Sequence, residues 1–205
     1  MQAYTTVLKA AAFEYEEKKS IFIGEACPVQ TEAEALEFIE LAKKRYPDAK
    51  HHVYAYVLRE NSTMRFSDDR EPQGTAGMPT LDAIRKNGCT DTVIVVTRYF
   101  GGTLLGTGGL VRAYTAAALG ALKNAEIITY DIYSEYTVTV GYSDHGKIVS
   151  ALTELGFRTD ETLYLDEVTL KGTVRSANED AFVQKITEAT SARAKITKNG
   201  EKFNF

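Results

Sequence analysis

The residues best placed to do chemistry lie in a glycine-rich segment, residues 97–114, which reads TRYFGGTLLGTGGLVRAY. It follows a predicted buried strand and leads into a predicted helix. Free backbone N–H groups at a helix start attract anions, and glycine lets a ligand approach the backbone closely. Two arginines could add charge-assisted hydrogen bonds to a phosphate or carboxylate. The candidate binding residues here are Arg98, Tyr99, Gly101, Gly102, Gly106, Gly108, Gly109 and Arg112.

This segment fits neither of the common nucleotide-binding motifs. Gly101 and Gly106 have the Walker spacing, but Thr107-Gly108 stands where that motif needs Lys followed by Ser or Thr. The dinucleotide motif fails as well, because Val111 stands where its third glycine belongs. A structural alternative stays open, in which the glycines only permit tight turns and both arginines pair with nearby acids. We favour binding, since loops carry binding residues more often than packing requires.

A second polar segment, residues 67–77, reads SDDREPQGTAG. Adjacent carboxylates on an extended backbone point to opposite sides, so they do not form an acid–base pair. A hard cation needs several oxygen ligands, and no second acidic cluster supplies them, so no metal site is predicted. Turn formation and helix capping are the favoured roles of the two aspartates. The candidate binding residues of this segment are Asp68, Asp69, Arg70, Glu71, Gly74 and Thr75.

Two consecutive histidines, His51 and His52, open a predicted strand and should face opposite sides of it. A hydrogen-bonded structural role is the default for each, and His52 is kept as a candidate binding residue. No Ser-His-Asp or Cys-His constellation can be assembled, so catalytic residues stay unassigned and an enzyme is not favoured. Cys27 and Cys89 lie far apart in the chain and are interpreted as reduced thiols.

The elements that must position these residues fall into two groups, with domains expected at residues 1–130 and 131–205. Periodicity and turn residues predict a C-terminal order β-α-β-β-α-β, the ferredoxin-like plan. Its first helix is expected over 146–155 with Ser143 or Asp144 as cap, and its second is expected to be capped by Ser176 or Asn178. The predicted strands of this part cover residues 133–141, 157–165, 167–174 and about 193–196.

The N-terminal part mixes strands and helices, so the fold class is α+β. Thr31 and Glu34 form a capping box for one helix, a short helix ends near residue 87, and a third is expected over residues 110–123. The continuous apolar run over residues 92–97 predicts a buried central strand. The other predicted strands cover residues 4–8, 20–27, 53–58 and 63–66.

Composition sets limits on function. The 205 residues are 44% hydrophobic and carry a net charge of −4, which argues against a broad nucleic-acid-binding face. Since no apolar run approaches the roughly 18 residues of a membrane span, we expect no membrane association. Residues 1–13 lack the pattern of a signal peptide, and the expected location is the cytoplasm. No cofactor is predicted.

The two polar segments together resemble the paired signatures of the IMPACT family, of which YigZ-like proteins are bacterial members. The strand HHVYAY is similar to a third family pattern, and the resemblance covers about residues 15–125. Residues 131–205 resemble the small C-terminal domain of bacterial members. The sequence departs from the pattern at three positions: Arg70 stands where a glycine is expected, Leu104 where a lysine is usual, and Thr107 where an alanine is usual.

This resemblance implies an N-terminal domain like the second domain of a small-subunit ribosomal protein, and a link to translation. The leading hypothesis is a non-enzymatic regulator that binds RNA, a ribosome or a translation-related protein. The acidic net charge favours a protein or ribosomal surface over free nucleic acid. The alternative is an enzyme or sensor for a small phosphorylated or carboxylated ligand, with His52 or Asp69 as proton-transfer group. A third interpretation makes both segments purely structural.

Overall fold

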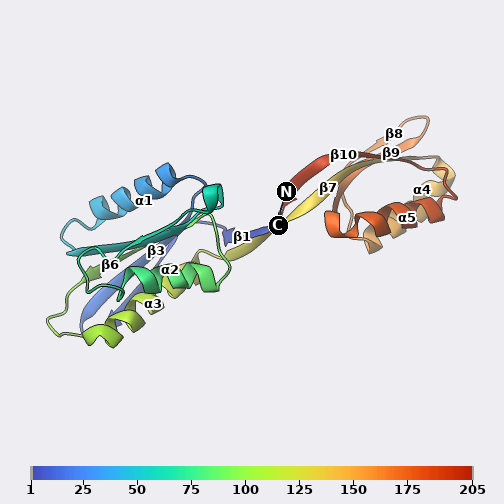
Figure 1. The fold of residues 1–205 in the computed structure, drawn as a ribbon. Helices are drawn as coiled ribbons and strands as arrows, with labels where there is room; N and C mark the ends of the chain where they lie inside the picture. The colour runs from blue at the N-terminus through green and yellow to red at the C-terminus, as the bar shows by residue number, and fades with distance from the viewer. Residues whose placement is uncertain (1, 205) are drawn as a thin grey trace. The chain divides into compact units, whose positions relative to one another are not determined.

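The computed structural model describes residues 2–204, which divide into two compact units. The N-terminal unit comprises Tyr4–Thr129, and the C-terminal unit comprises residues 130–204 together with residues 2 and 3. Each unit has its own sheet and its own helices (Figure 1), so the predicted α+β class is confirmed. Within residues 2–204, no helix combines the length and apolar character needed to cross a membrane.

The N-terminal unit is built on an antiparallel sheet with the strand order β2-β3-β6-β4-β5. Its central strand β6 is buried almost throughout, as its apolar sequence predicts. The outer strand β2 was not predicted, although Phe13 and Tyr15 alternate with Glu14 and Glu16 along it, a pattern typical of a half-buried strand. The strands are β2 (Ala11–Glu17), β3 (Ser20–Pro28), β4 (His51–Val57), β5 (Met64–Ser67) and β6 (Thr92–Tyr99).

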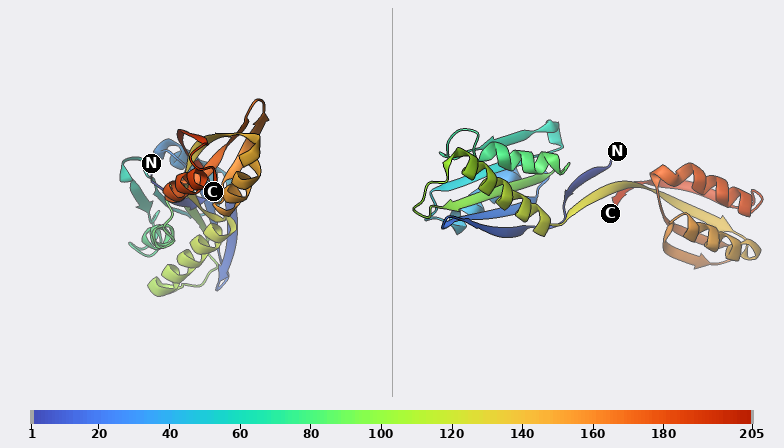
Figure 2. Two further views of the ribbon diagram at one scale, coloured as in Figure 1. Left: turned by 90° about the vertical axis from the view of Figure 1, so that its right-hand side faces the viewer. Right: turned by 90° about the horizontal axis from the view of Figure 1, so that it is seen from below.

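Helices cover both faces of this sheet. Helix α1 (Glu32–Arg45) lies on one face (Figure 1), and α2 (Gly77–Lys86) with α3 (Gly106–Asn124) lies on the other (Figure 2, right). The predicted cap of α1 is confirmed, since the Thr31 hydroxyl accepts a hydrogen bond from the Glu34 N–H at 3.3 Å.

Helix α3 begins at Gly106, four residues before the predicted start at residue 110. Glycine is unfavourable inside helices by about 1 kcal/mol, which made residues 106–109 look like loop. Buried Leu110, Ala113 and Tyr114 anchor the preceding turn in helical conformation.

The C-terminal unit has the sheet order β10-β7-β9-β8 with antiparallel neighbours, and strand β1 (Tyr4–Val7) also pairs with β7. Its two helices contribute to one hydrophobic core against the sheet. Chain order and sheet order together confirm the ferredoxin-like plan. The elements are β7 (Ile127–Val140), α4 (Tyr142–Glu154), β8 (Arg158–Tyr164), β9 (Val168–Arg175), α5 (Glu179–Ala189) and β10 (Lys195–Asn204).

The predicted cap of α4 was wrong. Helix α4 starts after Gly141, so Ser143 and Asp144 lie inside its first turn. Asp144 is buried and accepts hydrogen bonds from the Arg193 guanidinium at 2.9 and 3.0 Å, a long-range partner that local sequence does not reveal. For α5 the predicted position is correct for Asn178, which occupies the N-cap, but its side chain makes no capping hydrogen bond. Ser176 begins a short 3-10 turn before this helix.

Candidate functional site

The centre of the candidate site is the buried carboxylate of Glu71. Its Oε1 accepts hydrogen bonds from Arg98 Nη1 at 2.7 Å and from the Tyr114 hydroxyl at 2.8 Å. Arg98 lies near the end of β6 and Tyr114 lies on α3, so one carboxylate joins the 67–77 loop to both elements. Burial raises the pKa of Tyr114 far above its ordinary value, with a further contribution from the Glu71 charge, so its hydroxyl remains a donor.

Arg98 is enclosed rather than presented to solvent. Only 6% of the residue is exposed, and its guanidinium lies 5.3 Å from the Phe22 ring and 5.6 Å from the Phe100 ring. His51 stands opposite it on β4, with Nε2 at 4.0 Å from Glu71 Oε1. Because its charge is balanced by Glu71, Arg98 supports the loops instead of offering a free charge to a ligand.

Arg112 has the opposite environment. It is exposed on the second turn of α3 and forms no ion pair with any residue in the part of the chain that the structure describes. The structural alternative, in which both arginines are neutralised, therefore holds for Arg98 and fails for Arg112. The sequence did not distinguish the two, because the difference depends on where the Glu71 side chain lies.

The glycine loop packs directly on the turn between β2 and β3. A Cβ atom at Gly101 would lie 2.0 Å from the Lys19 carbonyl carbon, so only glycine fits there. The Gly101 N–H donates to the Ser20 hydroxyl at 3.1 Å. This contact brings Lys18 and Lys19 beside the loop, and both are exposed without ion pairs among residues 2–204. No motif in the sequence places these two lysines in the site, and only the sheet pairing reveals them.

The start of α3 carries no side-chain cap. Leu105 occupies the N-cap position and supplies no acceptor, and the first turn holds no acidic residue. Gly106 and Gly108 are exposed there, whereas Gly109 is buried and packs against Leu105. Gly102 is exposed with φ of 86°, which favours glycine, and Tyr99 is half-buried at the end of β6.

Asp68 caps helix α2, which is the kind of role that the sequence favoured for the acidic pair. Its Oδ1 accepts from the N–H groups of Ala76 at 3.0 Å and Gly77 at 2.7 Å. Its Oδ2 accepts from the Gly74 N–H at 2.9 Å. The buried Thr75 hydroxyl donates to the Pro72 carbonyl at 2.6 Å. These residues therefore fix the shape of the loop that carries Glu71.

Asp69 and Arg70 adopt left-handed backbone conformations, with φ of 39° and 68°. That region favours glycine, which is the residue that the family resemblance leads one to expect at position 70. The Asp69 carboxylate accepts from the His52 N–H at 2.6 Å, and its carbonyl lies 2.8 Å from His51 Nδ1. Arg70 is exposed, with Nε at 3.9 Å from the Asp69 carboxylate.

The structure does not bring the His52 ring to this cluster. Strand β4 directs it to the opposite face of the sheet, where Nε2 lies 3.0 Å from the Tyr46 carbonyl at the end of α1. His51 lies beside Glu71 instead. The sequence already indicated this placement of the His51 ring, because His51 shares the side of β4 with the core residues Val53 and Ala55.

Neither cysteine has the environment of a nucleophile. Burial raises the pKa of the Cys89 thiol to about 11 and also raises the pKa of Cys27. Both thiols are free. Among residues 2–204, no three His, Cys, Asp or Glu side chains gather closely enough to hold a metal ion.

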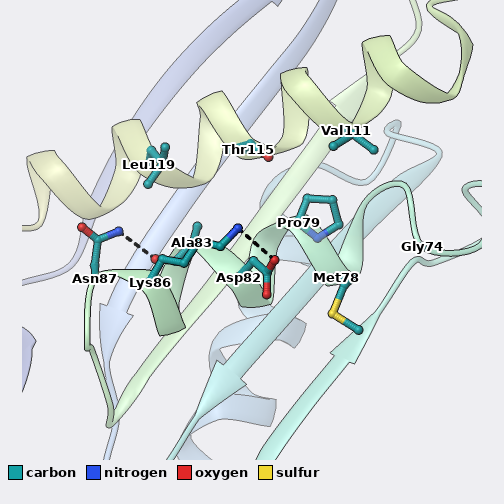
Figure 3. A pocket seen from close by; sticks show the side chains of 10 residues that line it. All are labelled: Gly74, Met78, Pro79, Asp82, Ala83, Lys86, Asn87, Val111, Thr115 and Leu119. Atoms are coloured by element: carbon teal, nitrogen blue, oxygen red, sulfur yellow. Dashed lines mark hydrogen bonds and ion pairs between the residues drawn. The ribbon is translucent and has the colours of Figure 1, made fainter.

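A groove of about 550 Å³ lies between α2 and α3 (Figure 3). Its walls include the apolar residues Met78, Val111 and Leu119. Its charged residues satisfy one another, since Lys86 Nζ lies 3.2 Å from Asp82 Oδ2. The groove therefore offers apolar surface rather than an anion site.

The fold and the site define a two-domain α+β protein with a glycine loop supported by a buried arginine–glutamate pair. Residues 18–122 match the Impact N-terminal domain, and residues 138–193 match a domain of unknown function, DUF1949. The chain is similar to the IMPACT family member YvyE of Bacillus subtilis, with 38% identity over 202 residues that cover 98% of this chain and 93% of the relative.

Two further proteins are also similar to this chain over most of its length. The IMPACT family member YigZ of Escherichia coli is 34% identical over 176 residues, covering 84% of this chain and 86% of that protein. A solved structure described as a hypothetical protein has a TM-score of 0.60 at 30% identity, covering 96% of this chain and 97% of the other. The chain belongs to the IMPACT family.

Proposed function

We propose that the protein is a non-enzymatic regulator linked to translation that binds RNA, a ribosome or a translation-related protein. Membership in the IMPACT family implies the regulatory, translation-linked role. The binding surface in this proposal is the glycine-loop face, defined as Lys18, Lys19, Arg70, Arg112 and the backbone of residues 101–108. Of the three kinds of partner, a ribosomal surface fits this face best.

The observation that carries the proposal is the gathering of unpaired cations around the glycine loop. The chain as a whole is acidic, with a net charge of −4, so any contact with phosphates must be local. Lys18, Lys19 and Arg112 form no ion pairs within residues 2–204, although many of the protein's other charges do. Cations without partners are the groups that replace counterions along a nucleic-acid backbone.

Apolar side chains beside these cations also fit a ribosomal surface. Phe100 is 49% exposed and Leu104 is 83% exposed, both within the loop. An exposed aromatic ring next to cations can stack on an unpaired base. In this proposal Arg98 and Glu71 do not contact the partner; they hold the loop and α3 in position.

Co-sedimentation with purified ribosomes and their subunits across a salt series tests the proposal. The variant Lys18→Gln/Lys19→Gln/Arg112→Gln should weaken binding at every salt concentration. It should also reduce the slope of log affinity against log salt by about 3, because each lost phosphate contact removes roughly one unit.

The matched control removes three cations elsewhere: Lys44→Gln/Arg85→Gln/Lys86→Gln. It changes the net charge equally and should leave binding unchanged. If both variants weaken ribosome binding equally, the loss reflects the change in net charge and not the glycine-loop face. If the wild type does not bind ribosomes at low salt, the ribosome is excluded as the partner.

A second candidate function is a sensor or enzyme for a small phosphorylated or carboxylated ligand. The uncapped start of α3 beside exposed Arg112 favours it, because unpartnered N–H groups and a guanidinium suit an oxyanion. Such a ligand would raise the melting temperature of the wild type and not of Arg112→Gln. A melting temperature that no phosphate or carboxylate compound changes at saturating concentration would remove this candidate.

A further inference from the structure

The groove between α2 and α3 exposes apolar side chains to solvent. On α3, Val111, Thr115 and Leu119 line it in a row at four-residue spacing (Figure 3). Val111 is 37% exposed and Leu119 is 42% exposed, and Met78 on α2 is 41% exposed. The outward positions of a surface helix are normally polar. Three exposed apolar side chains around one groove therefore indicate a surface that a partner covers.

The two helices that form the groove are cationic in a protein that is acidic overall. They carry four basic residues and one acidic residue, a net charge of +3, whereas the whole chain carries −4. The single acid, Asp82, is shared by Arg85 Nη1 at 3.9 Å and Lys86 Nζ at 3.2 Å. Lys123, four residues after Leu119, is exposed and forms no ion pair with any residue from 2 to 204. The edges of the groove therefore favour an acidic partner.

We propose that this groove binds an acidic amphipathic helix of a partner protein. Both of its walls are helices, whose backbone groups are hydrogen-bonded internally, so an extended peptide would find no sheet edge to pair with. A helix satisfies its own backbone and can place apolar side chains between the two rows of groove residues. Helix α2 has 10 residues. It is therefore about 15 Å long, and a partner helix of about three turns spans it.

Other occupants fit the groove less well. A small polar ligand needs converging polar groups. Within residues 2–204, none of the buried side-chain atoms without a hydrogen-bond partner belongs to the groove lining. A second copy docked groove to groove would bring two surfaces of like charge together. A lipid surface is flat and does not reach the floor of a concave groove. The proposal is independent of the proposed function, because it does not use residues 101–108.

Selection of displayed peptides on the immobilised full chain tests the proposal. The library holds random peptides of about 15 residues, roughly four helical turns. The recovered peptides should carry net negative charge and apolar residues at helical spacing, and circular dichroism should show that they are helical when bound. One recovered peptide, labelled with fluorescein, then serves as the probe in anisotropy titrations. Recovery of no peptide, or of basic or extended peptides, would overturn the proposal.

Variants of the apolar wall locate the bound probe. Val111→Glu/Leu119→Glu should raise the dissociation constant of the probe at least about tenfold, because it puts two charges where apolar side chains would be buried. The matched control Leu36→Glu/Leu41→Glu changes two exposed leucines of α1, on the opposite face of the sheet, and should leave affinity unchanged. Equal losses in the two variants, or no loss in the first, would refute the groove as the binding site.

Variants of the rim test the charge of the partner. Lys86→Gln/Lys123→Gln should raise the dissociation constant of the probe about threefold, since exposed ion pairs are weak. The control Lys44→Gln/Lys50→Gln changes the net charge equally and should not weaken binding. Equal weakening by both would overturn the choice of an acidic partner.

Two further measurements decide between kinds of occupant. Sedimentation of the full chain shows whether a dimer forms that Val111→Glu/Leu119→Glu dissociates. Such a dimer would assign the groove to a second copy and overturn the proposal. Flotation with phosphatidylserine vesicles that the same variant abolishes would assign it to a membrane instead. Absence of both, with probe binding lost in the variant, is the expected result.

Discussion

Glu71 and Arg98 form a buried ion pair, and the cost of breaking such a pair is larger than its net contribution. Glu71→Gln leaves the Arg98 guanidinium buried without a compensating charge. We expect the free energy of unfolding of the N-terminal unit to fall by about 3–5 kcal/mol, measured by urea unfolding with circular dichroism. The matched change Tyr114→Phe removes one hydrogen bond to the same carboxylate and should cost about 1 kcal/mol. Equal, small effects of the two changes would show that Arg98 is solvated.

The Tyr114 hydroxyl makes stability depend on pH in the alkaline range. Burial raises its pKa, and the Glu71 charge opposes a second negative charge beside it. Below about pH 10 both the folded and unfolded states keep the proton, so the contribution is fully present. Above about pH 10 the unfolded state loses a proton that the folded state retains, and stability falls by about 1.4 kcal/mol per pH unit.

Tyr114→Phe should therefore make the alkaline decline in stability less steep by about 1.4 kcal/mol per pH unit. Urea unfolding of both proteins from about pH 9 to about pH 11 measures the two slopes. Identical slopes would mean that the phenol ionises in the folded protein.

At the scale of elements, the close packing of α3 on β3 depends on one glycine. A Cβ atom at Gly24 would lie 2.4 Å from the Ala117 carbonyl oxygen, so Gly24→Ala must displace helix backbone. We expect a loss of about 1–3 kcal/mol in unfolding free energy. Gly108→Ala makes the same chemical change in the open first turn of α3 and should stabilise the protein by up to about 1 kcal/mol. Urea unfolding measures the change in unfolding free energy for each variant. A change of the same sign in both variants would contradict the close packing of α3 on Gly24.

The sequence predicted elements well where one local signal decides. The apolar run of β6, the Thr31 cap and the ferredoxin-like order are of this kind. Predictions failed where a distant partner decides: Arg193 takes Asp144 away from a capping role, and apolar anchors extend α3 over its glycines. In the candidate site, the sequence identified both segments. That Glu71 neutralises Arg98 and not Arg112 depends on where the Glu71 side chain lies. That Lys19 lies beside the glycine loop depends on the sheet pairing and on the contact of Gly101 with the turn between β2 and β3. No pattern within either segment contains that information.

At the scale of the whole molecule, the two units have separate hydrophobic cores. Leu170 is 3% exposed in the core of the C-terminal unit. Leu170→Ala should destabilise that unit by about 2–5 kcal/mol. Hydrogen exchange followed residue by residue should then accelerate in β7 and β9 and stay unchanged in β6, because β6 belongs to the other core. Faster exchange in β6 would show that the two units unfold as one.

The buried pair between Glu71 and Arg98 also has a consequence for how this chain can evolve. Each residue is tolerable only in the presence of the other, so a single substitution at either position passes through a poorly folded intermediate. We therefore expect the two positions to change together, and a selection from a library randomised at both should recover either the original pair or two uncharged residues of matching volume. Chains that keep only one of the two charges should be depleted. Selection should therefore act on the residue pair and not on either residue alone, although 26 codons separate the two positions.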